Sequence, residues 1–284
     1  VVEVALAIVV TATPASQSQP TTFARNETLY VSGAAWGPAS TWNPFQPGSL
    51  ANTTGTIGNV YEFLYVYDPL SGKLQPWLAE SGQWTDANTF EVTLRQGLTW
   101  SDGKPLTAKD VAFTYKLAIH PAIAQSAWVS NFASIKGAEA YQKGQATDIE
   151  GIKVVDDRTI RFELKAPNAS FLYGTYLGIL PEHVLGSVKP EELEKHPYVD
   201  APTVTSGPYE FVAFKADQHV QLKKRANYWG KPANLDEVYI KMFESTATML
   251  AQLEAGELAV AVVPADEAAR FRRLAHIDIV SVKG

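Results

Sequence analysis

The last third of the sequence places a helix-like run between two strand-like runs. Residues 238–243 (VYIKMF) and 258–263 (LAVAVV) are rich in apolar and β-branched side chains, and the second run is continuous enough to predict a strand covered on both faces. Residues 246–255 repeat apolar side chains at helical spacing; Ser245 can cap this helix and Gly256 can end it. Because a helix that joins two strands of one sheet makes them parallel, this region predicts an α/β fold.

The expected place for a ligand follows from this prediction. Open α/β sheets bind their ligands at the carboxyl ends of the parallel strands. In this sequence the first strand of the unit leads directly into Glu244, Ser245 and Thr246, which are therefore candidate ligand-binding residues.

A second candidate region is the Pro- and Gly-rich loop 33–49, which follows a predicted strand at 28–32. This loop contains Trp36 and Trp42. An exposed indole offers a ligand a flat apolar face and a free N–H donor. The same indoles could instead pack the loop against its own domain, and the sequence leaves both interpretations open.

The middle of the chain predicts a strand, a tight turn and a capped helix. Residues 89–95 alternate apolar and polar side chains, which indicates a half-buried strand, and residues 101–104 (SDGK) predict a turn. Thr107 and Asp110 have the spacing of a capping box at the start of a helix over 108–119. The side chains expected on the buried face of this helix are Val111, Ala112, Tyr115 and Ala118.

Four other segments have recognisable patterns. Residues 57–67 space their apolar side chains as a helix does, and residues 181–195 form a second helical segment marked by proline. Residues 152–164 predict a hairpin with Asp156 and Asp157 in its turn. Residues 209–224 predict two further strands that turn at 216–218.

The composition excludes several classes of function. The net charge is −6 and Lys and Arg are not clustered, so we expect no nucleic-acid partner. The absence of cysteine excludes disulfides and thiol catalysis. The sequence has no nucleophile-elbow, zinc-protease or phosphate-loop motif, and its five histidines lack metal-ligand spacing. We therefore expect no catalytic residues, no metal and no cofactor.

The first 24 residues form a segment of their own. They begin with an apolar run and continue with small and polar residues, as in the later part of a secretory signal peptide. The run is too short to span a bilayer. We interpret residues 1–24 as a signal-peptide remnant and disordered tail, with an apolar edge strand as the alternative, and we expect a periplasmic or secreted protein.

Five blocks of the sequence carry a family resemblance, and they occur in the expected order. They are STWNPF (40–45), the long block LAESGQWTDANTFEVTLRQGLTWSDGKPLTAKDVAFTYKL (78–117), TSGPYEF (205–211), LKKRANYWGKP (222–232) and LEAGELAV (253–260). Together they closely resemble the extracytoplasmic solute-binding proteins of the oligopeptide and dipeptide type, family 5, which serve ABC importers. One departure from the family pattern is Ala259, where an acidic residue is usual.

The resemblance implies an α/β, periplasmic-binding-protein-like fold of type II with two lobes and an extra inserted domain. Family members are roughly twice as long, so only the first lobe and the inserted domain are expected here. The first lobe would comprise residues 25–51 and 181–265, the inserted domain residues 52–180, and residues 266–284 would begin the second lobe.

The resemblance also implies a function without turnover. The protein would be a monomer and would come from a bacterium or archaeon. It would capture an oligosaccharide or oligopeptide between its lobes and deliver it to the permease subunits of an ABC importer. These permease subunits would be its only link to the membrane. The aromatic supply favours the oligosaccharide-binding branch, in which Trp36 and Trp42 would stack on sugar rings while Asn43, Ser245 and Thr246 bond to hydroxyls. The alternatives are a secreted carbohydrate-active enzyme and a chemosensory binding module.

Overall fold

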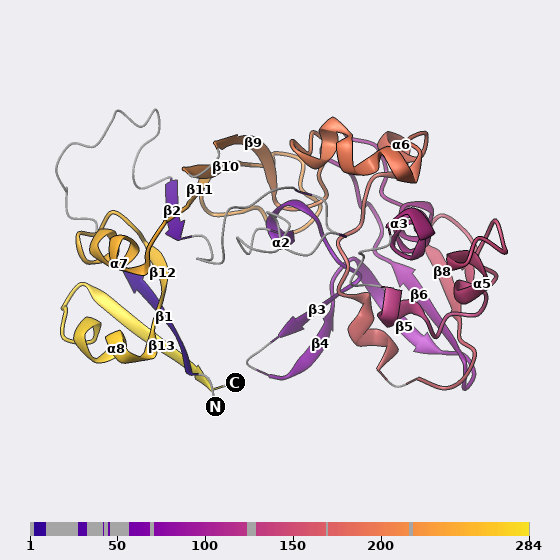
Figure 1. The fold of residues 1–284 in the computed structure, drawn as a ribbon, viewed down its shortest axis with the longest axis horizontal. Helices are drawn as coiled ribbons and strands as arrows, with labels where there is room; N and C mark the ends of the chain where they lie inside the picture. The colour runs from indigo at the N-terminus through magenta and orange to yellow at the C-terminus, as the bar shows by residue number, and fades with distance from the viewer. Residues whose placement is uncertain are drawn as a thin grey trace.

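The computed structural model describes residues 3–9, 28–32, 42, 45, 57–68, 71–123, 129–168, 170–215 and 218–283. Over these residues the chain is an α/β structure with a large sheet at one end and a smaller sheet at the other (Figure 1). The seven strands of the large sheet lie in the order β13–β1–β12–β2–β11–β10–β9. Their bounds are β1 Glu3–Val9, β2 Thr28–Ser32, β9 Tyr209–Lys215, β10 His219–Lys224, β11 Glu237–Lys241, β12 Val260–Val263 and β13 Ile277–Lys283.

The centre of the large sheet is parallel, as the sequence predicts. Strands β11 and β12 both run parallel to β2, which lies between them. The helix between them in the chain, α7 (Thr246–Glu254), begins at Ser245, whose Oγ accepts a hydrogen bond from the Thr248 N–H at 3.2 Å. Gly256 follows with a φ of +72°, in the left-handed region that a helix-ending glycine supplies without strain. The predicted strand–helix–strand unit is confirmed.

The prediction that β12 is covered on both faces is wrong. Ala261 and Val263 are buried in one cluster with side chains of both α7 and α8 (Ala265–Phe271). Val262, which points to the other face of the sheet, is 51% exposed. Both helices therefore cover the same face, and an uninterrupted apolar run does not reveal this.

The smaller sheet and its helices lie between β2 and β9 in the chain order, within the span of the large sheet, and are here called the inserted domain. The smaller sheet is antiparallel, in the order β5–β6–β8–β7, with the bounds β5 Ala79–Trp84, β6 Thr89–Leu94, β7 Ile152–Val154 and β8 Thr159–Glu163. Helix α3 (Ala108–Ile119) packs near β7 and β8, and its capping box forms as predicted between Thr107 and Asp110. Its buried side chains include Val111, Ala112, Tyr115 and Ala118, the face expected from the sequence.

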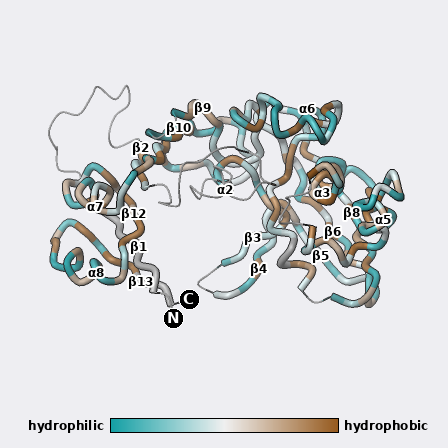
Figure 2. Tube along the Cα trace, in the orientation of Figure 1, coloured by the Kyte–Doolittle hydropathy of each residue, from teal (hydrophilic) through white to brown (hydrophobic). Residues whose placement is uncertain are grey.

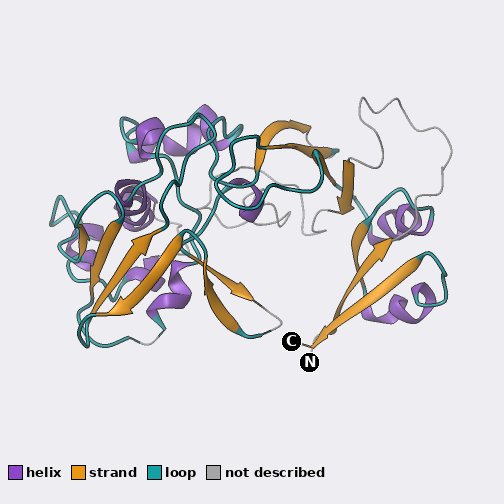
Figure 3. Ribbon diagram, turned by 180° about the vertical axis from the view of Figure 1, so that it is seen from behind, coloured by secondary structure: helices purple, strands orange, loops and turns teal. Residues whose placement is uncertain are grey.

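The hydropathy of the chain follows this packing. In Figure 2 hydrophobic stretches run through α3, whereas the outer segments around α5 (Ala138–Gln142) and α6 (Glu182–Leu185) are mostly hydrophilic. Figure 3 shows the smaller sheet and its helices grouped at one end of the molecule and α7 and α8 grouped with the large sheet at the other.

The remaining short helices are α4 Val129–Phe132, η1 Pro121–Ile123, η2 Phe171–Thr175, η3 Pro190–Lys195 and η4 Pro197–Val199. The segment 181–195 is thus two short helices.

The segment 57–67, predicted as one helix, changes conformation partway along its length. Helix α2 covers only Ile57–Val60, and strand β3 (Tyr65–Asp68) then pairs antiparallel with β4 (Lys73–Pro76). Between them the backbone bonds to distant segments: the Glu62 carbonyl accepts from the Ile179 N–H at 2.9 Å. Because residues 60–65 are all buried, the spacing of their apolar side chains does not indicate a helix.

The amino-terminal end of the chain differs from the sequence prediction. Residues Glu3–Val9, expected within a signal-peptide remnant and disordered tail, form strand β1 between β12 and β13. An apolar run can complete the backbone hydrogen bonds of a sheet by pairing with it, and the two termini consequently lie side by side (Figure 1). At the other end of the chain, residues 265–283 form α8 and β13, and β13 pairs with β1 at the edge of the large sheet. The assignment of residues 266–284 to a second lobe stays a prediction. The rest of the segment 1–24 lies outside the described residues.

Gly207 allows the segment 205–208 to come into backbone contact with α2. The N–H groups of Ser206 and Gly207, in the TSGPYEF block, both donate to the Val60 carbonyl of α2 at 3.0 Å. A Cβ at Gly207 would lie 2.2 Å from the Asn59 carbonyl oxygen and 2.9 Å from the Val60 nitrogen. Since these are backbone atoms, which cannot rotate away, only glycine fits at this position.

Gly207→Ala should therefore lower the free energy of unfolding by about 2–3 kcal/mol, because the added methyl group separates α2 from the 205–208 segment. Urea denaturation measures this change. Gly58→Ala is the matched control, since a Cβ there meets its first neighbour, the Phe63 ring, at an ordinary 3.5 Å. Equal stability of the two variants would contradict the close-approach argument.

Candidate ligand-binding site

The carboxyl ends of the parallel strands meet at one edge of the large sheet. Lys241 at the end of β11 lies opposite Ser32 at the end of β2, and β12 lies on the other side of β2. The segment after β11 carries the predicted site residues Glu244, Ser245 and Thr246, and all three are exposed. This edge therefore offers one carboxylate and two hydroxyl groups to a polar ligand, although the Ser245 hydroxyl also caps α7.

Trp42 does not lie open to a ligand. Its side chain is 1% exposed and meets the Phe211 ring edge-on, with ring centroids 5.3 Å apart. Its backbone N–H donates to the Val199 carbonyl at 2.5 Å. The prediction of a stacking platform at Trp42 is corrected to a packing role, because its ring is buried against Phe211 and its backbone bonds to Val199. Trp36 and Asn43 lie outside the described residues.

Aromatic side chains line the sheet close to this edge. Tyr30 and Tyr239 stack with centroids 5.3 Å apart, and the His219 ring lies 5.1 Å from Tyr239. The Lys241 ammonium lies 5.6 Å from the Tyr30 ring centroid and donates to the Gln252 side chain at 3.0 Å. Burial, together with neighbouring lysines, lowers the pKa of His219. These contacts fix the ends of β2 and β11 where the ligand site is expected.

A buried carboxylate that the sequence analysis missed, Glu62, lies where the segment after β4 meets the segment after β10. Glu62 is 0% exposed, and its oxygens accept hydrogen bonds from the Trp77 indole N–H at 3.0 Å, from the Trp229 indole N–H at 2.6 Å and from the Tyr228 hydroxyl. Its backbone N–H donates to the Ser206 hydroxyl at 2.9 Å. The signal in the sequence is an acidic residue inside the otherwise apolar run YEFLYVY, together with the Tyr-Trp pair of the block 222–232.

Burial dominates the electrostatics of Glu62. Removal from water raises the pKa of its carboxyl, while the three aromatic donors and the nearby positive charge of Arg225 act in the opposite direction. Arg225 is itself buried, and it donates to the carbonyls of Thr99 and Trp100 at 2.7 Å and of Ser206 at 3.1 Å. Burial lowers the pKa of this guanidinium. The two charges are thus held by neutral partners drawn from both parts of the chain.

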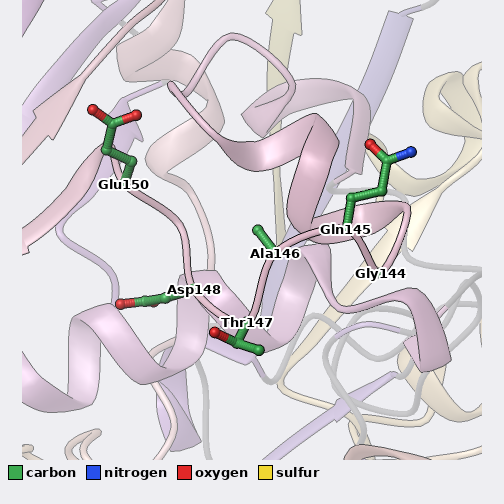
Figure 4. Close-up of a pocket in the computed structure, with 6 residues that line it drawn as sticks. All are labelled: Gly144, Gln145, Ala146, Thr147, Asp148 and Glu150. Carbon is green, nitrogen blue, oxygen red and sulfur yellow. The ribbon is translucent and has the colours of Figure 1, made fainter.

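A separate hollow of about 470 Å³ lies in the inserted domain (Figure 4). Its lining comes from one loop between α5 and β7: Gly144, Gln145, Ala146, Thr147, Asp148 and Glu150. The carboxylates of Asp148 and Glu150 already have cationic partners. Lys116 Nζ lies 2.6 Å from Asp148 Oδ1, and Lys136 Nζ lies 2.6 Å from Glu150 Oε1. This hollow lies at the opposite end of the molecule from α7 (Figure 1).

Neither metal chemistry nor a membrane span emerges from the described residues. They contain no group of three or more His, Asp or Glu side chains placed to hold a metal ion. Asp156 instead stabilises the turn of its hairpin, since its Oδ1 accepts from the N–H groups of Arg158 and Thr159 at 2.8 and 2.9 Å. No helix in the described part of the chain is long and apolar enough to cross a bilayer.

The sheet edge at the carboxyl ends of the parallel strands is the position at which open α/β sheets bind ligands, and here it bears exposed polar residues. Residues 73–284 match the family described as bacterial extracellular solute-binding proteins, family 5 middle. The chain therefore belongs to the family 5 solute-binding proteins, as its sequence blocks predict. This family is one of binding proteins, in agreement with the prediction that the chain is not an enzyme.

Individual relatives agree with this assignment. The chain is 28% identical over 245 residues to the oligopeptide-binding protein AppA of Bacillus subtilis, covering 82% of this chain and 41% of AppA. Its structure is similar to that of the mannohexaose-bound periplasmic oligopeptide-binding protein of Thermotoga maritima, with a TM-score of 0.69, 35% identity, and coverage of 84% of this chain and 41% of the other. The chain spans about two fifths of the length of the curated relatives it matches.

The fold alone is also shared with the structure of AppA in complex with a nonapeptide. The TM-score is 0.73 at 24% identity, and the match covers 87% of this chain and 46% of AppA. The predicted periplasmic-binding-protein-like fold is thus confirmed for the part of the family structure that this chain represents.

The pKa of Glu62 has a consequence for stability. A carboxyl whose pKa is raised in the folded state contributes stability that is complete below its unfolded pKa and is lost as the pH rises through the folded pKa. We expect the free energy of unfolding of the wild type, relative to Glu62→Gln, to fall as the pH rises from about 4.5, the ordinary value for this carboxyl. Urea unfolding at a series of pH values from 4 to 7 measures this difference.

The control for this series is Glu194→Gln, at an exposed glutamate of η3. The stability difference between this variant and the wild type is the baseline with which the Glu62→Gln difference is compared. A Glu62→Gln difference that follows this baseline at every pH would show that burial does not raise the pKa of Glu62.

Proposed function

We propose that this chain is the first-lobe and inserted-domain part of an extracytoplasmic substrate-binding protein of an ABC importer. The observation that carries the proposal is the match of residues 73–284 to the family 5 solute-binding proteins, on a fold whose parallel strand ends carry exposed polar residues. The protein acts as a periplasmic or secreted monomer. It captures its substrate between two lobes and delivers it to the permease subunits, without catalysis.

The proposed substrate is an oligosaccharide, with an oligopeptide as the alternative. Two features support the sugar: the mannohexaose-bound relative is 35% identical, against 24% for the nonapeptide-bound AppA, and the sheet edge supplies hydroxyl and carboxylate groups. Sugar hydroxyls bond well to such short polar side chains, and sugar rings stack on indoles. We therefore assign Trp36, Asn43, Glu244, Ser245 and Thr246 to ligand binding.

Ligand binding by the full-length protein tests this proposal. Mannohexaose or a cello-oligosaccharide should raise the midpoint of thermal unfolding, because a ligand at a hundred times its Kd stabilises the folded state by about 2.7 kcal/mol. A shift with peptides and none with sugars would replace the sugar by a peptide as substrate. No shift with any member of either series would contradict the receptor function itself.

Two substitutions locate the site within the full-length protein. Thr246→Ala should weaken sugar binding about fivefold, because it removes one hydrogen bond at the sheet edge, and Trp36→Ala about tenfold, because it removes a stacking surface. Isothermal titration calorimetry measures both. The matched control is Thr147→Ala in the hollow of the inserted domain, where the threonine is also exposed. Loss of binding in the control alone would move the site to that hollow.

The polypeptide Val1–Gly284 alone should bind the same sugar weakly or not at all. A site that closes between two lobes draws contacts from both, and this chain supplies the first. The check is the same thermal shift at a sugar concentration that saturates the full-length protein, after circular dichroism has confirmed that the polypeptide is folded. Equal affinity of the two proteins would place the whole site in the first lobe and the inserted domain.

A further inference from the structure

One tryptophan outside the sheet edge has its ring exposed and its orientation fixed. Trp77, directly after β4, is 41% exposed, whereas Trp42 and Trp100 are fully buried. Its backbone N–H donates to the Leu64 carbonyl at 2.9 Å, and its own carbonyl accepts from Arg95 Nε at 2.5 Å. Its indole N–H donates to the buried Glu62 carboxylate. The ring therefore cannot turn away without breaking its hydrogen bond to the buried Glu62 carboxylate.

The exposed part of this indole selects for one kind of surface. Because Glu62 takes the N–H, what remains for a ligand is apolar ring surface. The Trp229 ring meets the Trp77 ring edge-on, with centroids 6.2 Å apart and a 76° angle, and forms an adjoining aromatic wall. The Arg95 guanidinium lies 5.8 Å from the Trp229 ring centroid and brings hydrogen-bond donors to the rim of the cluster.

A pyranose ring matches this combination of an apolar face and a donor at its edge. Its C–H groups can lie against the indole while its hydroxyls accept from the guanidinium. A peptide amino terminus would need an accessible carboxylate, and the one that touches the indole, Glu62, is buried and already accepts from three donors. The cluster thus favours an uncharged ring over a charged terminus.

We propose that Trp77 is a stacking subsite for a sugar ring of the oligosaccharide ligand, with Glu62 as the positioning residue that holds the indole and Arg95 as a hydroxyl-binding group. This inference rests on the proposed function, since it assigns a further contact to the same substrate. It places a contact in the segment between β4 and β5, far along the chain from Glu244–Thr246.

The test uses the full-length protein with mannohexaose as the probe. Trp77→Ala should raise the Kd measured by calorimetry about five- to tenfold, the size of effect typical of one aromatic contact. Trp77→Phe keeps a ring face but loses the hydrogen bond to Glu62 that orients it, so it should lower the unfolding midpoint and raise the Kd by less than Trp77→Ala does. Trp84→Ala is the matched control, at a tryptophan 38% exposed that packs against Phe90 and Phe171, and it should leave the Kd unchanged.

The outcomes separate this inference from the proposed function. If the wild type binds mannohexaose and Trp77→Ala binds it equally well, the subsite is overturned and the receptor function stands. If Trp77→Ala and Trp77→Phe weaken binding equally, the indole acts through the fold and not through stacking, which also overturns the subsite. If the wild type binds a nonapeptide and no mannohexaose, the sugar assignment and the subsite fall together, and the importer function remains.

Discussion

Two opposite charges are buried where the inserted domain meets the large sheet, and each is held by neutral partners. Glu62 receives three hydrogen bonds from aromatic side chains, and Arg225 donates to backbone carbonyls on both sides of the junction. Leaving either group without partners in this environment would cost several kcal/mol. The partners come from segments that are distant in the sequence, so the charges can be satisfied only when both parts of the chain are in place.

The same junction determines how close the backbones come. Ser206 joins the two charged groups, because its hydroxyl accepts from the Glu62 N–H and its carbonyl accepts from Arg225. Next to it, Gly207 lets the segment approach α2 to hydrogen-bonding distance. The block TSGPYEF, which carries part of the family resemblance, is thus explained by packing at this junction and needs no contact with a ligand. The backbone hydrogen bonds of Ser206 and Gly207 to Val60 connect this segment directly to α2.

Local patterns predicted the elements whose burial is one-sided. The capping box at Thr107 and Asp110, the strand at β6 and the helix α7 between Ser245 and Gly256 all formed where their periodicity and end signals placed them. Patterns failed where burial is complete or comes from distant segments. Residues 61–65 are buried whichever conformation they adopt, so their spacing could not distinguish a strand from a helix, and the run 258–263 could not reveal that α7 and α8 cover the same face.

The candidate site divides in the same way. Glu244, Ser245 and Thr246 could be proposed from the sequence because the position of a ligand relative to parallel strands follows from topology, which the sequence indicates. Whether a tryptophan side chain is buried or exposed depends instead on its surroundings in the fold, including the groups near its indole N–H. Trp42 is buried, and its indole nitrogen has no hydrogen-bond partner among the described residues. Trp77 gives its N–H to a buried carboxylate and keeps its ring partly in water.

An exposed ring costs hydrophobic free energy in the unliganded protein, since apolar area stays in contact with water. The hydrogen bond to Glu62 stabilises this arrangement, because turning the indole inward would break it. The orientation of the Trp77 ring is therefore tied to the place where the fold buries an acidic group, 15 residues away in the chain. Loop composition, which directed attention to Trp36 and Trp42, carries no information about that acidic group.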